Sequence, residues 1–116
     1  MSGSTAAELI EHIREAILQV SIYLDGIEKN QFDSDKRTQQ AVILNLIILG
    51  EAATKLIYHH PATIAQYPLI EWRSMRGMRN RIAHGYRDID FGVVWTTASA
   101  ALPPIHNRLR QLRQIG

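Results

Sequence analysis

The sequence predicts an all-α protein built as a four- to five-helix bundle. Apolar residues recur at three- and four-residue steps over most of the chain, and long stretches contain neither glycine nor proline. With 116 residues, of which 46% are hydrophobic, the chain is long enough for one core but not for two. We therefore predict a single helical domain over residues 1–116.

The first helix is predicted to begin after Thr5. Thr5 and Glu8 have the spacing of a capping box, in which the threonine oxygen accepts a free amide of the first turn and the glutamate reaches back. Apolar residues follow at helical spacing, with glutamates on the other side. This amphipathic helix is expected to end within residues 26–28.

Residues 29–32 are predicted to be a connector, and Asp33 or Ser34 to cap a second helix over about residues 35–58. Its middle, residues 41–49, is apolar nearly all round but too short to cross a bilayer, which needs roughly 20 residues. No membrane partner is therefore expected. A helix that is apolar on every side must be covered on every side, so it is either central in the bundle or shared with another copy. We predict the second arrangement, a homodimer formed through long helices.

The second half of the chain is predicted to hold two further helices. Residues 61–68 are expected to form a short helical turn and a loop, followed by a third helix over residues 70–84. Asp88 or Asp90 can cap a fourth helix, whose apolar residues continue to Leu112. Pro103 and Pro104 are expected to kink that helix or to divide it.

Cysteine content and charge restrict the function. Without cysteine there is no disulfide and no thiolate metal site, and the N-terminus lacks the pattern of a secretory signal, so we predict a cytoplasmic protein. The net charge is only +2, but arginines gather in the second half. Such segregation is typical of a protein with one face for an anionic ligand, and Arg73, Arg76 and Arg81 are predicted to bind phosphate. The alternative is a solvated charged surface.

Residues 79–86 hold the side chains that are best suited to chemistry. On a helix, Met75, Met78 and Ile82 form an apolar stripe. Arg79 falls at the edge of this stripe, beside Trp72, and is predicted to face a partly buried surface. Asn80 and His84 are at positions i and i+4, one above the other on the neighbouring polar face. Gly85 can end the helix in the left-handed conformation, which places Tyr86 clear of it.

These residue types suit phosphate chemistry. Guanidinium offers a planar donor fork that matches phosphate oxygens, and histidine can gain or lose a proton near neutral pH. Arg79 near His84, with an amide to orient one of them, would be enough to cleave RNA without a metal or another cofactor, since the ribose 2′-hydroxyl is the nucleophile. The alternative is that Arg79 pairs with a carboxylate, His84 caps a helix C-terminus and the arginines form a solvated face.

Glu51 follows the apolar run of the second helix and shares its face with Leu44 and Ile48. It has two interpretations. One is an ion pair with Lys55, four residues further along the helix. The other is a supporting role, in which the carboxylate orients Arg79 or His84.

With these residues in view, the sequence resembles the HEPN superfamily and, within it, the HepT-like toxins of two-gene toxin–antitoxin systems. The resemblance depends on Arg79, His84 and Tyr86 at this spacing, with further similarity over residues 50–53 and 90–95. It spans nearly the whole domain. It implies a helical bundle that dimerises, with the motifs of both chains lining a cleft at the interface, and a metal-independent endoribonuclease activity.

The resemblance also implies roles for individual residues. Arg79 would stabilise the charge that grows on the phosphate, His84 would act as general acid or base, and Asn80 would orient the pair. Tyr86 would be AMPylated by a cognate nucleotidyltransferase antitoxin of the MNT type, which switches the toxin off. Without the resemblance, a phenol packed against the bundle is the favoured interpretation of Tyr86.

Two other functions remain open at this point. The arginines could hold RNA or a nucleotide without cleaving it, in a non-catalytic HEPN module that partners a nucleotidyltransferase. The chain could also be a purely structural dimerisation partner of such an enzyme. A higher heteromeric complex with the nucleotidyltransferase is a further expectation. Neither alternative needs a catalytic His84.

Overall fold

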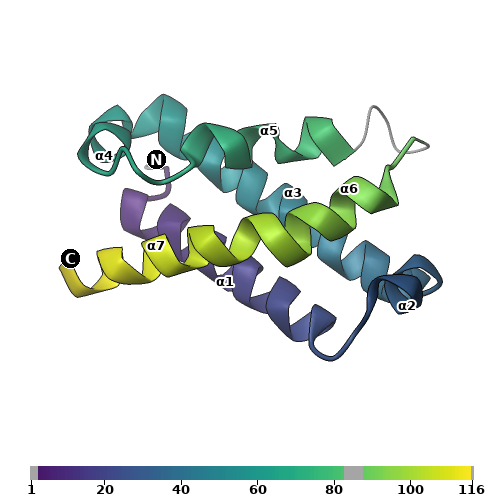
Figure 1. Ribbon diagram of the computed structural model, residues 1–116. Helices are drawn as coiled ribbons and strands as arrows, with labels where there is room; N and C mark the ends of the chain where they lie inside the picture. Colours follow the sequence, from purple (N-terminus) through teal and green to yellow (C-terminus); the bar gives the residue numbers. More distant parts are fainter. Residues whose placement is uncertain (1–2, 83–87, 116) are drawn as a thin grey trace.

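The computed structural model describes residues 3–82 and 88–115, with side chains as far as residue 112 in the last helix. The described residues form helices and no β-strand, which confirms the predicted all-α class. In chain order the elements are α1 (Ala6–Leu24), α2 (Lys29–Asp33), α3 (Lys36–His59), α4 (Pro61–Gln66), α5 (Trp72–Ile82), α6 (Phe91–Thr96), the π-helical turn η1 (Thr97–Ala101) and α7 (Leu102–Ile115) (Figure 1).

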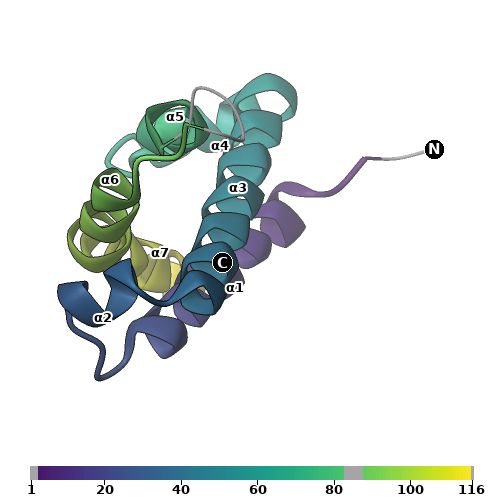
Figure 2. The same ribbon diagram turned by 90° about the vertical axis from the view of Figure 1, so that its right-hand side faces the viewer.

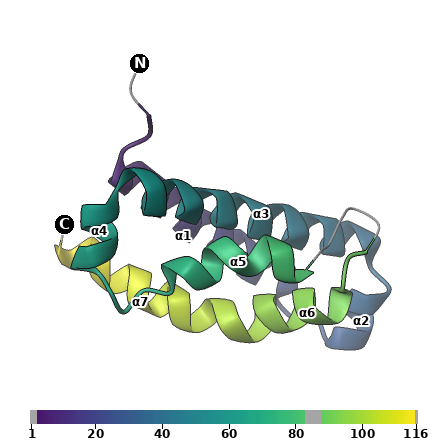
Figure 3. The same cartoon turned by 90° about the horizontal axis from the view of Figure 1, so that it is seen from above.

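The long helices surround one hydrophobic core. Figure 2 shows α1, α3, α5 and the run of α6, η1 and α7 around a common axis, and Figure 3 shows α3, α5 and α7 lying lengthwise beside one another. The short helices α2 and α4 lie at opposite ends of the bundle. The largest fully buried side chains come from α1, α2, α3, α5 and α7: Ile13, Val20, Phe32, Leu46, Leu49, Leu56, Met75, Met78, Ile82, Leu102, Ile105 and Leu109.

The start of α1 confirms the predicted capping box. The Glu8 amide donates to the Thr5 hydroxyl at 3.1 Å, and the Thr5 amide donates to the Glu8 carboxylate at 2.9 Å. The helix ends at Leu24, slightly earlier than predicted, and the chain turns through Gly26 at a φ of +74°. Glycine suits this left-handed position because it has no Cβ.

The connector predicted at residues 29–32 is wrong, because this segment forms α2. The Glu28 amide donates to the Gln31 side chain at 2.8 Å, and Lys29 pairs with Asp33 at 2.9 Å. Burial of Phe32, whose ring lies 5.4 Å from that of Trp95, fixes the short helix against the core. Tertiary packing therefore stabilises a helix that is too short to form alone.

Asp35 caps α3, and not Asp33 or Ser34 as predicted. Its carboxylate accepts hydrogen bonds from the Thr38 amide at 3.1 Å and from the Thr38 hydroxyl at 2.6 Å. Both bonds favour the ionised form, so they lower the pKa of Asp35. The helix starts one residue later than the boundary predicted from the sequence.

Helix α3 is the central helix, with α1 packed along one side and α5 along another. By length and composition alone it is the one helix within the described ranges that could cross a membrane, with a mean hydropathy of 1.6 over its most apolar stretch. The core helix of a bundle can have the same length and apolar composition. Helix α3 is such a core helix, because α1 and α5 pack against it. Its third side is not covered, since Leu44 is 57% exposed and Ile48 is 40% exposed.

The last helical run confirms the predicted interruption, but the irregular turn precedes the prolines. Asp90 caps α6 by accepting from the Val93 amide at 3.1 Å, as predicted. The backbone then widens into the π-helical turn η1. Pro103 and Pro104 follow directly as the second and third residues of α7. Because they have no N–H group, they cannot donate back into η1, from which the helical backbone continues without a break.

Candidate functional site

Helix α5 separates a buried apolar stripe from an exposed polar face. Trp72, Met75, Met78 and Ile82 are buried in the core, as the periodicity predicted. On the outer side, exposed polar side chains occupy successive turns: Arg73, Arg76, Arg79 and Asn80. Arg79 is exposed, so the prediction that it faces a partly buried surface is wrong. Its long side chain lets the guanidinium leave the edge of the stripe and reach water.

The contact between α3 and α5 is closest at Gly50. A Cβ atom at this position would lie 3.2 Å from the Met75 carbonyl oxygen and 4.0 Å from that of Arg76. The absence of a side chain at Gly50 therefore lets the α5 backbone lie directly against α3. Helical spacing puts Arg76 and Arg79 on the flank of α5 that faces α3.

Glu51 is exposed on α3, next to the glycine at the contact with α5. Among the residues with described side chains, Glu51 forms no ion pair with Lys55 or with an arginine. Its supporting role toward Arg79 or His84 therefore stays a prediction. Its position next to the α3–α5 contact is compatible with that role.

Arg81 lies apart from the other arginines of α5. Its guanidinium donates to the Ser74 carbonyl at 3.0 Å, seven residues back along the helix. This bond holds the side chain along the flank opposite Arg76 and Arg79. The structure therefore brings Arg73, Arg76, Arg79 and Asn80 together on one surface and places Arg81 outside it.

The predicted residues His84 and Tyr86 lie outside the described residues, so their roles stay predictions. The described chain comes together on either side of them. The Asp90 amide donates to the Ile82 carbonyl at 2.8 Å. The two flanks of the segment with His84 and Tyr86 therefore meet at the C-terminal end of α5, where Arg79 and Asn80 lie.

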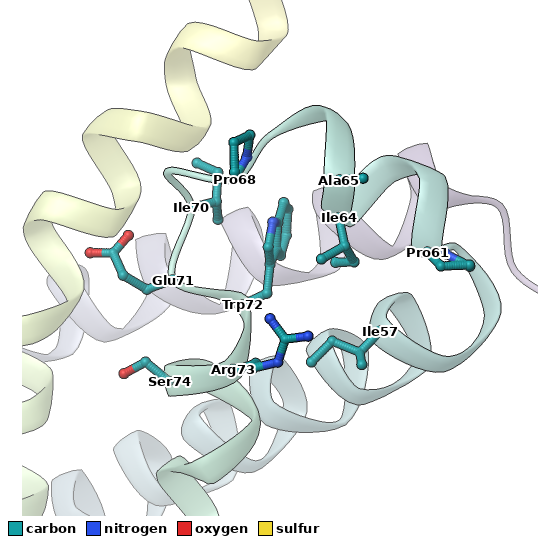
Figure 4. A pocket seen from close by; sticks show the side chains of 10 residues that line it. All are labelled: Ile57, Pro61, Ile64, Ala65, Pro68, Ile70, Glu71, Trp72, Arg73 and Ser74. Carbon is teal, nitrogen blue, oxygen red and sulfur yellow. The ribbon is translucent and has the colours of Figure 1, made fainter.

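A groove that the sequence did not reveal opens at the other end of α5. We call it the α4–α5 groove: it has a volume of about 570 Å³ and lies between the C-terminal part of α3, helix α4 and the first turn of α5. Figure 4 shows Arg73 inside it, between Trp72 and Ile57. Among the lining residues, Pro61 begins α4 and Pro68 follows it, and these two prolines are what the sequence offers as an indication of the groove.

A second surface is apolar. We call it the outer α1–α3 face: Leu18 and Ile22 of α1 are 47% and 56% exposed, and Leu44 and Ile48 of α3 lie on the neighbouring helix. A hollow of about 230 Å³, lined in part by Leu18, Ile48 and Asn45, lies between the two helices. Grouped exposed apolar side chains of this kind are typical of an interaction surface.

The described residues form an all-α bundle with a row of exposed arginines on one helix, an arrangement that is typical of proteins that bind polyanions. Comparison with known proteins names the class. The family described as Ribonuclease HepT-like matches residues 13–112. The probable ribonuclease HepT of Thermococcus cleftensis is 33% identical over 108 residues, which cover 92% of this chain and 94% of that relative.

A protein of Methanocaldococcus jannaschii named as a putative RNase is 26% identical over 108 residues, covering 93% of this chain and 81% of the relative. No solved structure matches the chain at a significant level. The chain belongs to the HepT-like ribonuclease family. The resemblance to this family, and with it the prediction of a ribonuclease, is confirmed.

Proposed function

We propose that this protein is a metal-independent endoribonuclease toxin of a two-gene toxin–antitoxin system that acts in the cytoplasm. The observation that carries the proposal is the placement of Arg79 and Asn80. Both are exposed at the end of α5, where the hydrogen bond between Asp90 and Ile82 joins the flanks of the segment with His84. Membership of a ribonuclease family supports the same function.

In the proposed reaction the 2′-hydroxyl of the substrate loses its proton to a base and attacks the adjacent phosphorus. The bond from phosphorus to the 5′-oxygen breaks, and that oxygen takes a proton from an acid. His84 performs these proton transfers, and Arg79 stabilises the negative charge on the phosphate oxygens. The products are a 2′,3′-cyclic phosphate and a 5′-hydroxyl. Asn80 orients the reacting groups, and Arg73 and Arg76 bind neighbouring phosphates.

We also propose a homodimer that forms through the outer α1–α3 face. Leu44 and Ile48 are exposed on the same side of α3 as Glu51, three residues further on, and Glu51 borders the contact with α5. A second copy that covers this face would therefore bring two α5 helices to one cleft. Two copies of His84 could then divide the roles of acid and base.

Regulation by AMPylation of Tyr86 belongs to the same proposal. An MNT-type nucleotidyltransferase would transfer AMP from ATP to the phenol and release pyrophosphate. The added phosphate would compete with RNA for Arg79 and Arg76, which are exposed and therefore accessible to it. The antitoxin would form a heteromeric complex with the dimer.

The test is RNA cleavage by the purified protein in EDTA, with the ends of the products identified by mass. We expect cyclic phosphate ends, and at least 100-fold slower cleavage by His84→Ala and Arg79→Ala with unchanged thermal unfolding. Arg110→Ala, which removes an exposed arginine from the C-terminal half of α7, at the opposite end of the bundle from the end of α5 (Figure 3), is the matched control and should cleave normally. Equal cleavage by His84→Ala and the wild type would contradict the mechanism.

The non-catalytic RNA-binding module remains the second candidate, because the exposed arginines of α5 support it equally. It predicts retention of RNA that salt weakens, with no cleavage. Intact mass of the protein expressed with and without a neighbouring nucleotidyltransferase tests the modification separately. An adduct of one or more AMP units that Tyr86→Phe abolishes is the expected result.

A further inference from the structure

The α4–α5 groove is an apolar cleft with one cation directed into it. Its walls are aliphatic and proline side chains around an indole: Ile57, Pro61, Ile64, Pro68, Ile70 and Trp72. At about 570 Å³ it lies within the roughly 300–1,000 Å³ that is usual for small-ligand sites. Trp72 is anchored as part of the floor, because its indole N–H donates to the Tyr67 carbonyl at 2.9 Å.

The charges around the groove favour an anionic ligand. Arg73 lies inside the groove, below the indole of Trp72 (Figure 4). The Glu71 carboxylate turns away from Arg73 in the same view and pairs with Arg108 of α7. Glu71 also lines the groove and its Oε1 is buried without a hydrogen-bond partner among the described residues, but its charge is compensated by the ion pair of its Oε2 with Arg108. Arg73 has no such ion pair among the residues with described side chains, so it leaves a positive charge at the groove.

The groove is continuous with the candidate catalytic surface. Arg73, Arg76 and Asn80 follow one another at i, i+3 and i+7, so they lie on one exposed face of α5. At 1.5 Å per residue this row extends about 10 Å along the helix. A single strand of RNA held at Arg79 can follow the row and reach the groove with a flanking nucleotide.

We propose that the α4–α5 groove binds the base of a nucleotide that flanks the cleaved bond, while Arg73 contacts the phosphate of that nucleotide. This proposal rests on the proposed ribonuclease function. Proteins that hold single-stranded nucleic acid place cations along its backbone and apolar, usually aromatic, surfaces against its bases. Trp72 is buried in the floor here, so the aliphatic and proline side chains of the walls are the surface that a base would contact. Because the walls are mainly aliphatic, the affinity of the groove depends on the presence of a base more than on which base it is.

The experiment combines a blocked groove with a missing base. Ala65 is exposed and lines the groove, so Ala65→Trp fills it. Ala62 is exposed on the same helix but does not line it, so Ala62→Trp is the matched control. The substrate is an oligonucleotide with one ribonucleotide among deoxynucleotides, which has a single cleavable linkage, and a base is removed at each flanking position in turn.

We expect that removal of one particular flanking base raises KM about tenfold for the wild type and for Ala62→Trp. For Ala65→Trp, KM is expected to be raised already and to stay the same with and without that base. The kcat should change little in all cases, because the groove binds a part of the substrate that does not react. The comparison between the intact and the base-free oligonucleotides uses the wild type, so it does not depend on whether a variant folds.

The outcomes separate this proposal from the ribonuclease function. If the wild type cleaves RNA but neither base removal nor Ala65→Trp changes KM, the groove proposal is wrong and the function stands. If the wild type binds RNA without cleavage, the ribonuclease mechanism is wrong. The Kd then replaces KM in the same comparisons, and a Kd that neither base removal nor Ala65→Trp changes would show that the groove proposal is wrong too. A wild type that neither binds nor cleaves RNA overturns both.

Discussion

The Asp90 amide and the Ile82 carbonyl lie 2.8 Å apart in a hydrogen bond that joins the end of α5 to the residue before α6. The Asp90 side chain meanwhile accepts from the Val93 amide and caps α6. One residue thus fixes both the start of α6 and the place where the chain returns to α5. The segment with His84 and Tyr86 is bounded by this junction.

Asp90→Ala is therefore expected to lower both stability and activity. Loss of an N-cap costs about 1 kcal/mol, which corresponds to a Tm lower by roughly 4 °C in a domain of this size. Cleavage should fall by more than the loss of folded protein explains, because the junction beside Arg79 loosens. Thr5→Ala removes the N-cap of α1, which lies at the opposite end of the bundle from this junction (Figure 1), and should lower Tm similarly while activity is retained. Equal activity losses in both variants would contradict this view of the junction.

Two glycines offer a test of the contact between α3 and α5. A Cβ at Gly50 would lie 3.2 Å from the Met75 carbonyl, whereas a Cβ at Gly77 in α5 meets nothing within 4 Å. Gly50→Val is expected to lower the free energy of unfolding by about 1–3 kcal/mol, because it forces the helices apart. Gly77→Ala is expected to raise it by up to about 1 kcal/mol through helix propensity. Urea unfolding of both variants checks the opposite signs, and a stable Gly50→Val would show that the contact is not tight.

Local patterns predicted the parts of the fold that depend on neighbouring residues. The Thr5–Glu8 capping box, the Asp90 cap and the buried stripe of Met75 and Met78 all follow from spacing along the chain, and the structure confirms them. The helix at residues 29–33 did not follow, because burial of Phe32 against other helices stabilises it.

The candidate site was likewise predicted only in part. The exposed arginines and Asn80 are visible in the sequence, but their orientation depends on contacts that a sequence pattern does not contain. Arg81 was grouped with Arg73 and Arg76, yet its bond to the Ser74 carbonyl turns it to the other flank. The groove around Arg73 exists only because α4 and α5 approach one another in three dimensions.

This difference between the arginines predicts different salt dependences of RNA binding. The measurement uses a non-cleavable deoxy oligonucleotide at several salt concentrations. Removing one phosphate contact to a single strand lowers the slope of log K against log salt by about 0.7. Arg73→Gln and Arg76→Gln are each expected to show this loss, whereas Arg81→Gln should leave the slope nearly unchanged. An equal loss for Arg81→Gln would place that residue in the RNA-binding surface.

His106 predicts a pH dependence of stability. Burial lowers the pKa of His106 below its usual value of 6.5, with smaller contributions from Arg110 and Arg14. The unfolded chain therefore binds this proton more readily than the folded one. The contribution of His106 to stability is complete above about pH 6.5 and declines as the pH falls through the lowered pKa. Urea unfolding at pH 7.5 and pH 5.5 should show a smaller pH effect in His106→Gln than in the wild type, and an equal effect would exclude this histidine as the cause.

The outer α1–α3 face predicts a monomeric variant. Leu44 and Ile48 are 57% and 40% exposed in the single chain, so a charge at either position does not disturb its core. If a second copy covers this face, Leu44→Glu and Ile48→Glu leave the helical content unchanged but convert the dimer to a monomer in light scattering, because the carboxylate would be buried without a partner. Leu69→Glu is the matched control, since Leu69 is 82% exposed in the loop after α4. Cleavage should fall with dimerisation in the first two variants only, because the proposed cleft needs α5 from both copies. A wild type that is monomeric at the concentrations at which it cleaves RNA would instead show that one copy carries a complete site.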